Sequence, residues 1–194
     1  MKAITNGKFI LPDENDEFQV RTGNVLLYDE MGIHAVKDAA SFDAAADGVA
    51  PADILDAGGC YVAPGFLNVH IHGCGGADTM DEAPEALTTI RKKQAEMGVT
   101  AFLPTTMTCP WNEIAGALTR VRAAMDVHGV GAEILGAHME GPFISPAEKG
   151  SQEETNILPA DFGKLAPFAD VVRLVTLAPE ELPRKAGTDV RDWS

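Results

Sequence analysis

The sequence predicts an α/β fold in which a small β-domain precedes strands that alternate with helices. Hydrophobic residues make up 45% of the 194 residues and charged residues 23%, proportions typical of a globular protein with a packed core. The first sixty residues contain short β-type runs separated by polar turns. From Tyr61 onward, apolar strand patterns alternate with helix patterns, which is typical of βα units and a parallel sheet.

The N-terminal domain is predicted to span residues 1–60. Its expected strands are 8–11, 24–28, 32–36 and 53–56. Segment 39–48 is rich in alanine but lacks larger apolar residues at helical spacing, so it is either a short helix or a polar connection. The second domain is predicted to span residues 61–194.

Strands and helices alternate in this second domain. The expected strands are the end of 61–72, then 100–103, 133–139 and 171–177, and the expected helices are 84–97, 110–127 and 159–168. Pro84 lies in the first turn of the first helix and Gly98 follows its end. Right-handed crossovers place the C-terminal ends of parallel strands on one side of the sheet, in a barrel or in an open sheet.

The composition excludes several classes of partner and compartment. The net charge is −14 and the sequence pI is about 4.6, which disfavours nucleic acid and anionic membrane surfaces. The sequence contains neither an apolar run long enough to span a membrane nor a signal peptide. Three cysteines outside any CxxC spacing indicate reduced thiols. We therefore expect a cytoplasmic protein.

Two histidines end the first strand of the second domain. Side chains two residues apart in a strand share one face, so His70 and His72 can converge on one metal ion. Glu140 follows the third strand and would add a carboxylate at the same end of the sheet. Two nitrogens and one oxygen suit zinc, iron or manganese and leave positions open for water and substrate. The chemistry that these residues imply is metal-assisted hydrolysis.

Other polar residues near these motifs have simpler interpretations. His138 shares a face with Glu140, and we favour packing or support of a ligand over direct ligation. Cys74 adjoins the histidines, but a small residue in a turn is favoured over a ligand for a soft ion. Asp78 and Asp81 precede a helix, and loop capping explains them more simply than a catalytic carboxylate pair.

Several motifs in fixed order resemble a known family. They are Pro64-Gly65-Phe66 through His70-Ile71-His72-Gly73, Gly76-Ala77-Asp78-Thr79-Met80-Asp81, Pro104-Thr105-Thr106, and His138-Met139-Glu140-Gly141-Pro142-Phe143 with Lys149-Gly150. The sequence is similar to N-acetylglucosamine-6-phosphate deacetylases, of the amidohydrolase superfamily, over about residues 1–180. The resemblance implies a (β/α)₈ barrel of metal-dependent hydrolase type with a small β-sandwich domain, here represented by a partial barrel and an incomplete sandwich.

The resemblance also implies an activity in amino-sugar metabolism. It is hydrolysis of the acetamide of N-acetylglucosamine 6-phosphate to glucosamine 6-phosphate and acetate, with one or two divalent ions, zinc being expected and iron or manganese being alternatives. Glu140 matches the family's metal-binding glutamate, and His70 and His72 match the pair that holds a further metal in some members. Gly141 and Gln152 are implied to contact the sugar, Gln152 in place of a histidine. Family members usually form homodimers.

The chain ends about halfway through a family-length protein. The family's other histidine ligands and its general-base aspartate lie on later strands, so this chain is expected to contain no complete catalytic set and to be inactive alone. Segment 183–194 lacks the family pattern, which suggests a truncated or frameshifted product.

Two other functions are considered. A dihydroorotase-like enzyme would need a lysine ligand on the fourth strand, where 174–177 offers none. A non-catalytic fragment would instead bind metal or associate through open strand edges.

Overall fold

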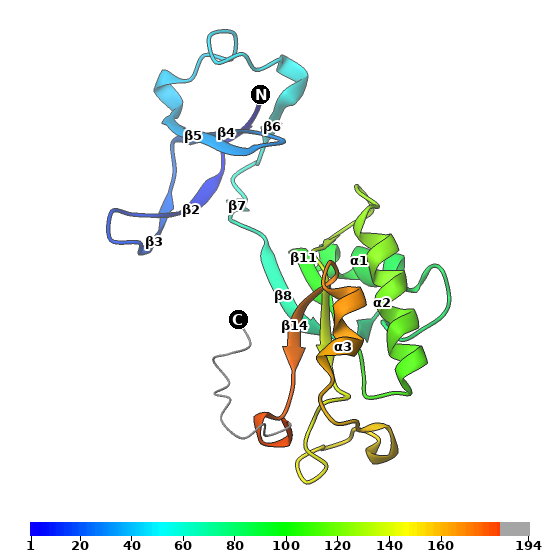
Figure 1. Cartoon of the computed structure of the whole chain (residues 1–194). Helices are drawn as coiled ribbons and strands as arrows, with labels where there is room; N and C mark the ends of the chain where they lie inside the picture. Colours follow the sequence, from blue (N-terminus) through cyan, green and yellow to red (C-terminus); the bar gives the residue numbers. More distant parts are fainter. Residues whose placement is uncertain (183–194) are drawn as a thin grey trace. The chain divides into compact units, whose positions relative to one another are not determined.

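A computed structural model describes residues 1–182 of the chain (Figure 1). These residues form two compact units, one comprising Met1–Pro64 and the other beginning at Gly65. Segment 183–194, in which the sequence suggests a truncation or frameshift, lies outside the described residues. Each unit has its own sheets and its own buried apolar core.

The first unit contains two small mixed sheets. One has the order β5-β4-β1-β6, built from β1 (Lys2–Thr5), β4 (Asn24–Asp29), β5 (Gly32–Asp38) and β6 (Ile54–Asp56). The other has the order β3-β2-β7, built from β2 (Lys8–Pro12), β3 (Phe18–Arg21) and β7 (Tyr61–Val62). The four predicted strands are present, whereas β1, β3 and β7 were not predicted.

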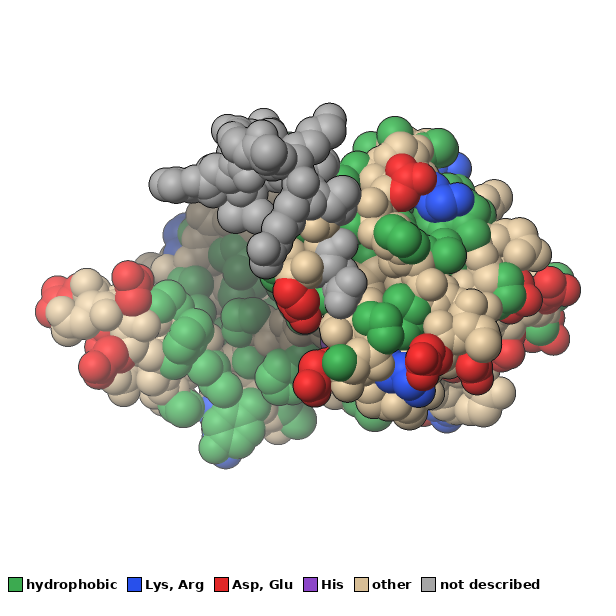
Figure 2. Space-filling view, turned by 60° about the horizontal axis from the view of Figure 1, so that its bottom comes forward, with side chains coloured by type: hydrophobic (Ala, Val, Ile, Leu, Met, Phe, Trp, Pro, Cys, Tyr) green, Lys and Arg blue, Asp and Glu red, His purple; other side chains and the backbone are tan. Residues whose placement is uncertain are grey.

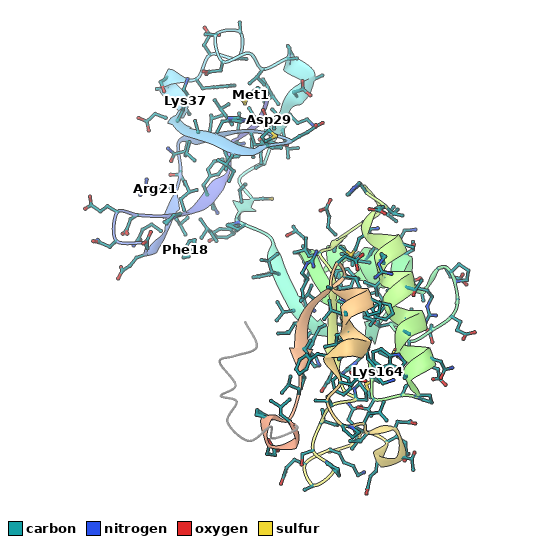
Figure 3. All side chains as sticks on the ribbon, in the orientation of Figure 1. Met1, Phe18, Arg21, Asp29, Lys37 and Lys164 are labelled. Atoms are coloured by element: carbon teal, nitrogen blue, oxygen red, sulfur yellow. The ribbon has the colours of Figure 1, made fainter. Side chains whose placement is uncertain are left out.

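The core of the first unit is small because its strands are short. Ala3, Val25, Leu27 and Val49 are almost fully buried against one another. The segment 39–48, left open by its pattern, contains one short 3₁₀ helix at Ala39–Ser41 and no α-helix; another 3₁₀ helix lies at Pro51–Asp53. Phe18 on β3 remains 66% exposed (Figure 3).

The second unit is built on parallel strands. They are β8 (Phe66–Ile71), β11 (Val99–Pro104), β12 (Glu133–Ile134), β13 (Ala137–Glu140) and β14 (Val172–Thr176). β11 pairs with β8 and β12, and β13 pairs with β14. A parallel bridge from Thr105 to His138 joins the end of β11 to β13. The spatial order is therefore β8, then β11, then β12 and β13, which follow one another alongside β11, and finally β14.

Helices α1 (Ala86–Glu96) and α2 (Trp111–Met125) lie next to each other on one side of these strands (Figure 1). Apolar residues recur at helical spacing in α2, at Ile114, Ala117, Leu118 and Val121, and all four are fully buried. Ile114, Leu118 and Val121 pack with Phe102 and Met139 of the strands in the main core. Helix α3 (Phe162–Leu165) is tied to α2 through the loop that follows it, where Arg122 forms a two-point ion pair with Asp170.

Short elements complete the second unit. A hairpin of β9 (Gly73–Cys74) and β10 (Ala77–Asp78) follows β8. The 3₁₀ helices are Glu154–Asn156, Ala166–Phe168 and Pro179–Glu181. Apart from Ala166–Phe168, which lies within the helix expected over 159–168, none of these short elements was predicted.

Two predicted elements of the second unit are wrong in extent. The strand expected over 133–139 is two strands, because the chain changes its pairing partner at Gly136: β12 pairs with β11, whereas β13 pairs with β14. Gly136 has φ +149°, and a Cβ there would lie 2.6 Å from the Val171 carbonyl oxygen. The helix expected over 159–168 is α-helical only at Phe162–Leu165, since Pro167 lies in a 3₁₀ turn.

The surface agrees with the acidic composition. Acidic side chains outnumber basic ones on the face shown in Figure 2. Among the described residues, no helix is both long enough and apolar enough to cross a membrane.

The α2 core contact supports a stability prediction. Leu118→Ala is expected to lower the free energy of unfolding by about 2–5 kcal/mol, because the Leu118 side chain is fully buried and its truncation leaves a cavity beneath α2. Leu135→Ala is the control, since Leu135 is 47% exposed and should change stability far less. Urea unfolding followed by circular dichroism measures both, and equal losses would contradict the packing described.

Candidate metal centre

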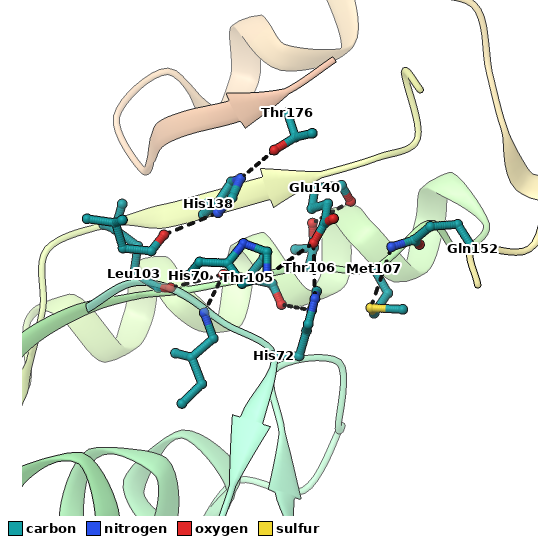
Figure 4. A network of polar contacts seen from close by, with 12 residues as sticks. His70, His72, Leu103, Thr105, Thr106, Met107, His138, Glu140, Gln152 and Thr176 are labelled. Atoms are coloured by element: carbon teal, nitrogen blue, oxygen red, sulfur yellow. Dashed lines mark hydrogen bonds and ion pairs between the residues drawn. The ribbon is translucent and has the colours of Figure 1, made fainter. Parts of the chain in front are cut away.

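The polar residues predicted at the strand ends come together in the structure. His70 lies in β8, His72 follows its end, and Glu140 is the last residue of β13 (Figure 4). Parallel pairing brings these strand ends together: the Thr105 amide donates to the Ile71 carbonyl at 2.9 Å, and the Thr106 amide donates to the His138 carbonyl at 3.0 Å. The segment after β11 therefore lies between the two histidines and the carboxylate.

Three potential ligand atoms converge at this point. Glu140 Oε2 lies 3.0 Å from His72 Nε2 and 3.5 Å from His70 Nε2. The potential ligand atoms of His70, His72 and Glu140 all lie within 4.8 Å of one another. Within residues 1–182, no other set of three or more His, Cys, Asp or Glu side chains comes together in this way. The side chains are partly accessible, with 49% of His70, 30% of His72 and 22% of Glu140 exposed.

The hydrogen bonding of His72 determines which of its ring nitrogens faces Glu140. His72 Nδ1 lies 3.2 Å from the Thr105 carbonyl oxygen, which can only accept, so Nδ1 carries the proton. In the neutral ring, Nε2 then presents a lone pair to Glu140 Oε2. That oxygen is buried and accepts no hydrogen bond from the described residues. Lone pairs that face one another need a positive charge between them, and a divalent cation fits this requirement.

His70 is held mainly by ring contacts. Among the described residues its ring makes no hydrogen bond, apart from the approach of Nε2 to Glu140. Its ring meets those of His72 and His138 edge to face, with centroids 5.0 Å apart in each case. The orientation of His70 therefore depends on its aromatic neighbours.

His138 supports the cluster rather than joining it. Its Nδ1 bonds the Val69 carbonyl at 3.2 Å and its Nε2 bonds the Thr176 hydroxyl at 2.7 Å, so both ring nitrogens are engaged. The side chain is almost fully buried, with 4% exposed. Burial first, and the neighbouring His70 second, lower the pKa of His138 and favour its neutral form. The structure thus places His138 in the packing and supporting role that the sequence analysis favoured over direct ligation.

A buried amide supports β8 from the side of α1. Asn68 Nδ2 donates to Gln94 Oε1 at 2.9 Å, and Asn68 Oδ1 accepts from the His70 amide at 3.2 Å. Gln94 is 1% exposed, and its Nε2 also approaches Cys74 Sγ at 3.7 Å. Cys74 thus lies against this buried amide and outside the three-residue group. The sequence analysis missed Gln94, because a single polar residue in a predicted helix gives no sign that it is buried.

The residues expected to contact substrate follow β13. Gly141 has φ +66°, and a Cβ there would lie 2.0 Å from Thr108 Oγ1, so only glycine fits this close approach. Gln152 Oε1 accepts from the Thr108 amide at 2.8 Å, and its Nε2 approaches Met107 Sδ at 3.9 Å. In this structure the Gln152 amide therefore binds the loop after β11.

Asp78 and Asp81 act as loop caps, as expected. Asp78 Oδ1 accepts from the Met80 amide at 2.8 Å, and Asp81 Oδ2 accepts from the Asp78 amide at 2.8 Å. Each carboxylate is committed to local backbone, which leaves the three-residue group as the chemically distinctive feature.

The Gln152 contact gives a testable expectation. Gln152→Ala should lower the free energy of unfolding by about 1 kcal/mol, because the Thr108 amide loses its acceptor. Amide hydrogen exchange at Thr108 should become faster. Gln152→Glu keeps an acceptor oxygen and is the control. Unchanged exchange at Thr108 in Gln152→Ala would contradict the contact.

The sequence is similar to two bacterial deacetylases of amino-sugar phosphates. The chain is 42% identical over 139 residues to N-acetylglucosamine-6-phosphate deacetylase of Bacillus subtilis, a match covering 68% of this chain and 34% of that protein. It is 33% identical over 135 residues to N-acetylgalactosamine-6-phosphate deacetylase of Escherichia coli O157:H7, covering 68% and 36%. The chain spans about a third of the length of these relatives.

Solved structures extend the similarity over nearly all of the chain. N-acetylglucosamine-6-phosphate deacetylase from Pasteurella multocida aligns with a TM-score of 0.77 at 26% identity, covering 93% of this chain and 45% of that one. The Amidohydrolase family profile matches residues 61–184, which include the three clustered residues. The chain therefore belongs to the amidohydrolase family.

Proposed function

We propose that this chain is the N-terminal part of an enzyme that hydrolyses the acetamide of N-acetylglucosamine 6-phosphate to glucosamine 6-phosphate and acetate. The observation that carries the proposal is the convergence of His70, His72 and Glu140 at the ends of β8 and β13. The similarity to named deacetylases supports the choice of an amino-sugar phosphate as substrate.

The proposed architecture is the first half of a (β/α)₈ barrel preceded by an incomplete β-sandwich. Support for the partial barrel comes from the parallel order of β8, β11, β13 and β14, with α1 and α2 against one side. Support for the sandwich, proposed for residues 1–60, comes from the two small sheets of the first unit. We propose the barrel for residues 61–194.

We propose that His70, His72 and Glu140 hold a divalent cation. Zinc is the proposed metal, because two imidazoles and one carboxylate are a common zinc set; iron and manganese are the alternatives, and the site takes one or two ions. Such an ion supplies Lewis acidity, which polarises an amide carbonyl and makes water more acidic. Thr105 keeps His72 in the tautomer whose Nε2 is free to ligate.

The other functional residues follow β13. Gly141 and Gln152 are proposed to contact the sugar. Since Gln152 Oε1 accepts from the Thr108 amide, the Gln152 NH₂ group is the one proposed to face the sugar. All three clustered residues are assigned to the metal and none is left to act as a general base, so this chain alone is proposed to have little or no activity. The full enzyme is proposed to be a cytoplasmic homodimer with neither nucleic-acid nor membrane partners, in keeping with the net charge of −14.

A second candidate function is a non-catalytic fragment that binds metal or self-associates. The observation in its favour is the exposure of apolar residues on β8, where Phe66, Leu67 and Val69 are 70%, 67% and 57% exposed. Unpaired edges with apolar side chains invite association. A dihydroorotase-like function is not favoured, since β14 contains no lysine.

Metal binding by the chain tests the proposed centre. The wild-type chain is expected to bind Zn²⁺, and Glu140→Gln should weaken binding by at least about tenfold, because it removes one charged ligand. Glu133→Gln is the matched control, since Glu133 lies on β12 with its side chain 56% exposed. Isothermal titration calorimetry measures both. Equal affinities in wild type and Glu140→Gln would refute the centre.

Activity tests the substrate. Residues 1–180 joined to the remaining part of the Bacillus subtilis deacetylase should release acetate from N-acetylglucosamine 6-phosphate, whereas the 194-residue chain should release little or none. Glu140→Gln in the chimera should lower the rate by about 100-fold or more. N-acetylgalactosamine 6-phosphate is the competing substrate. A chimera that prefers this epimer would overturn the assigned sugar while leaving the hydrolase intact.

A further inference from the structure

We propose that His138 and Thr176 form a positioning pair that orients His70 toward a divalent cation, while neither residue ligates it. This inference rests on the proposed metal centre. The observation behind it is that His70 and His72 are restrained in different ways, although they lie two residues apart (Figure 4).

His72 is restrained directly. Its Nδ1 bonds the Thr105 carbonyl, which fixes both the tautomer and the plane of the ring. His70 has no equivalent bond among the described residues, and its side chain is 49% exposed. Without a neighbour to hold it, the His70 imidazole could rotate about its side-chain bonds and carry Nε2 away from Glu140.

His138 supplies that neighbour. Its ring meets His70 edge to face at a centroid distance of 5.0 Å and an interplanar angle of 71°. The His138 side chain is almost completely buried, so it offers a fixed surface. His72 contacts the His70 ring in the same manner at 87°, so the two rings together restrict His70.

The position of His138 is itself fixed by strands on both sides. Val69 in β8 accepts from Nδ1, and Thr176 at the end of β14 donates its hydroxyl to Nε2. The carbonyl oxygen can only accept, so Nδ1 carries the proton and Nε2 uses its lone pair on Thr176. No ring nitrogen of His138 is left for a metal, which makes this residue a positioning residue.

Thr176 is the residue through which the pair can be tested. Its hydroxyl bonds His138, and its side chain is no member of the three-residue cluster. Its backbone lies opposite Glu140 in the β13–β14 pairing, so the variants change the side chain and leave the strand in place. Thr176→Val keeps the shape and the β-branched backbone preference but removes the donor. Thr176→Ser keeps the donor, so it should restore whatever the valine variant loses.

The experiment measures Zn²⁺ affinity of the full 194-residue chain by competition with a chromophoric chelator. Thr176→Val should weaken binding by about tenfold, the lower end of the 10–100-fold range typical of residues that orient ligands. Thr176→Ser should bind like wild type. Thr119→Val is the matched control, because the Thr119 hydroxyl is exposed and, within residues 1–182, bonds only the Ala115 carbonyl of α2.

A second variant separates positioning from ligation. His138→Asn should weaken binding, but at saturating Co²⁺ the bound ion itself holds His70 in place, so the visible absorption spectrum should match that of wild type, with the number and kind of ligands unchanged. His34→Asn, in the first unit, is its control. A changed spectrum in His138→Asn would identify a ligand and overturn the inference.

The outcomes distinguish this inference from the proposed function. Wild-type affinity in Thr176→Val would overturn the positioning pair while leaving the metal centre in place. A wild-type chain that binds neither Zn²⁺ nor Co²⁺ would overturn the metal centre, and the positioning pair with it. Loss in Thr176→Val with recovery in Thr176→Ser supports both.

Discussion

The requirement for a positive charge between Glu140 Oε2 and the Nε2 atoms of His70 and His72 is the constraint on which the site depends. Each nitrogen lies within 3.5 Å of that oxygen, and the oxygen accepts no hydrogen bond from the described residues. The Thr105 carbonyl directs the His72 proton away from the cluster. Lone pairs that face one another are unfavourable, and a cation bound between the three side chains would satisfy all of them.

The fold meets this constraint through strand pairing. β8 contributes the histidines and β13 contributes the carboxylate, while the end of β11 lies between them and bonds both. The change of pairing partner at Gly136 allows one stretch of chain to serve first β11 and then β14. Helices α1 and α2 bury one side of these strands, and the site forms at the strand ends.

Much of this organisation could be predicted from the sequence, because it depends on local patterns. The alternation of strands and helices from Tyr61 onward was correct, and so was the convergence of two histidines with Glu140. The sequence-based prediction was less accurate where long-range contacts override local preference. Gly136 divides a strand because Val171 approaches it, and the 159–168 helix is shortened by Pro167.

The sequence alone determined the residue types, their spacing and the family, because side-chain chemistry and strand periodicity are local properties. Only the tertiary structure decided which groups hold the ligands in place. His138 bonds Val69, 69 positions away, and Thr176, 38 positions away, while Gln152 bonds Thr108 at a separation of 44. No local pattern encodes these partners, since they depend on which strands and loops become neighbours when the sheet assembles.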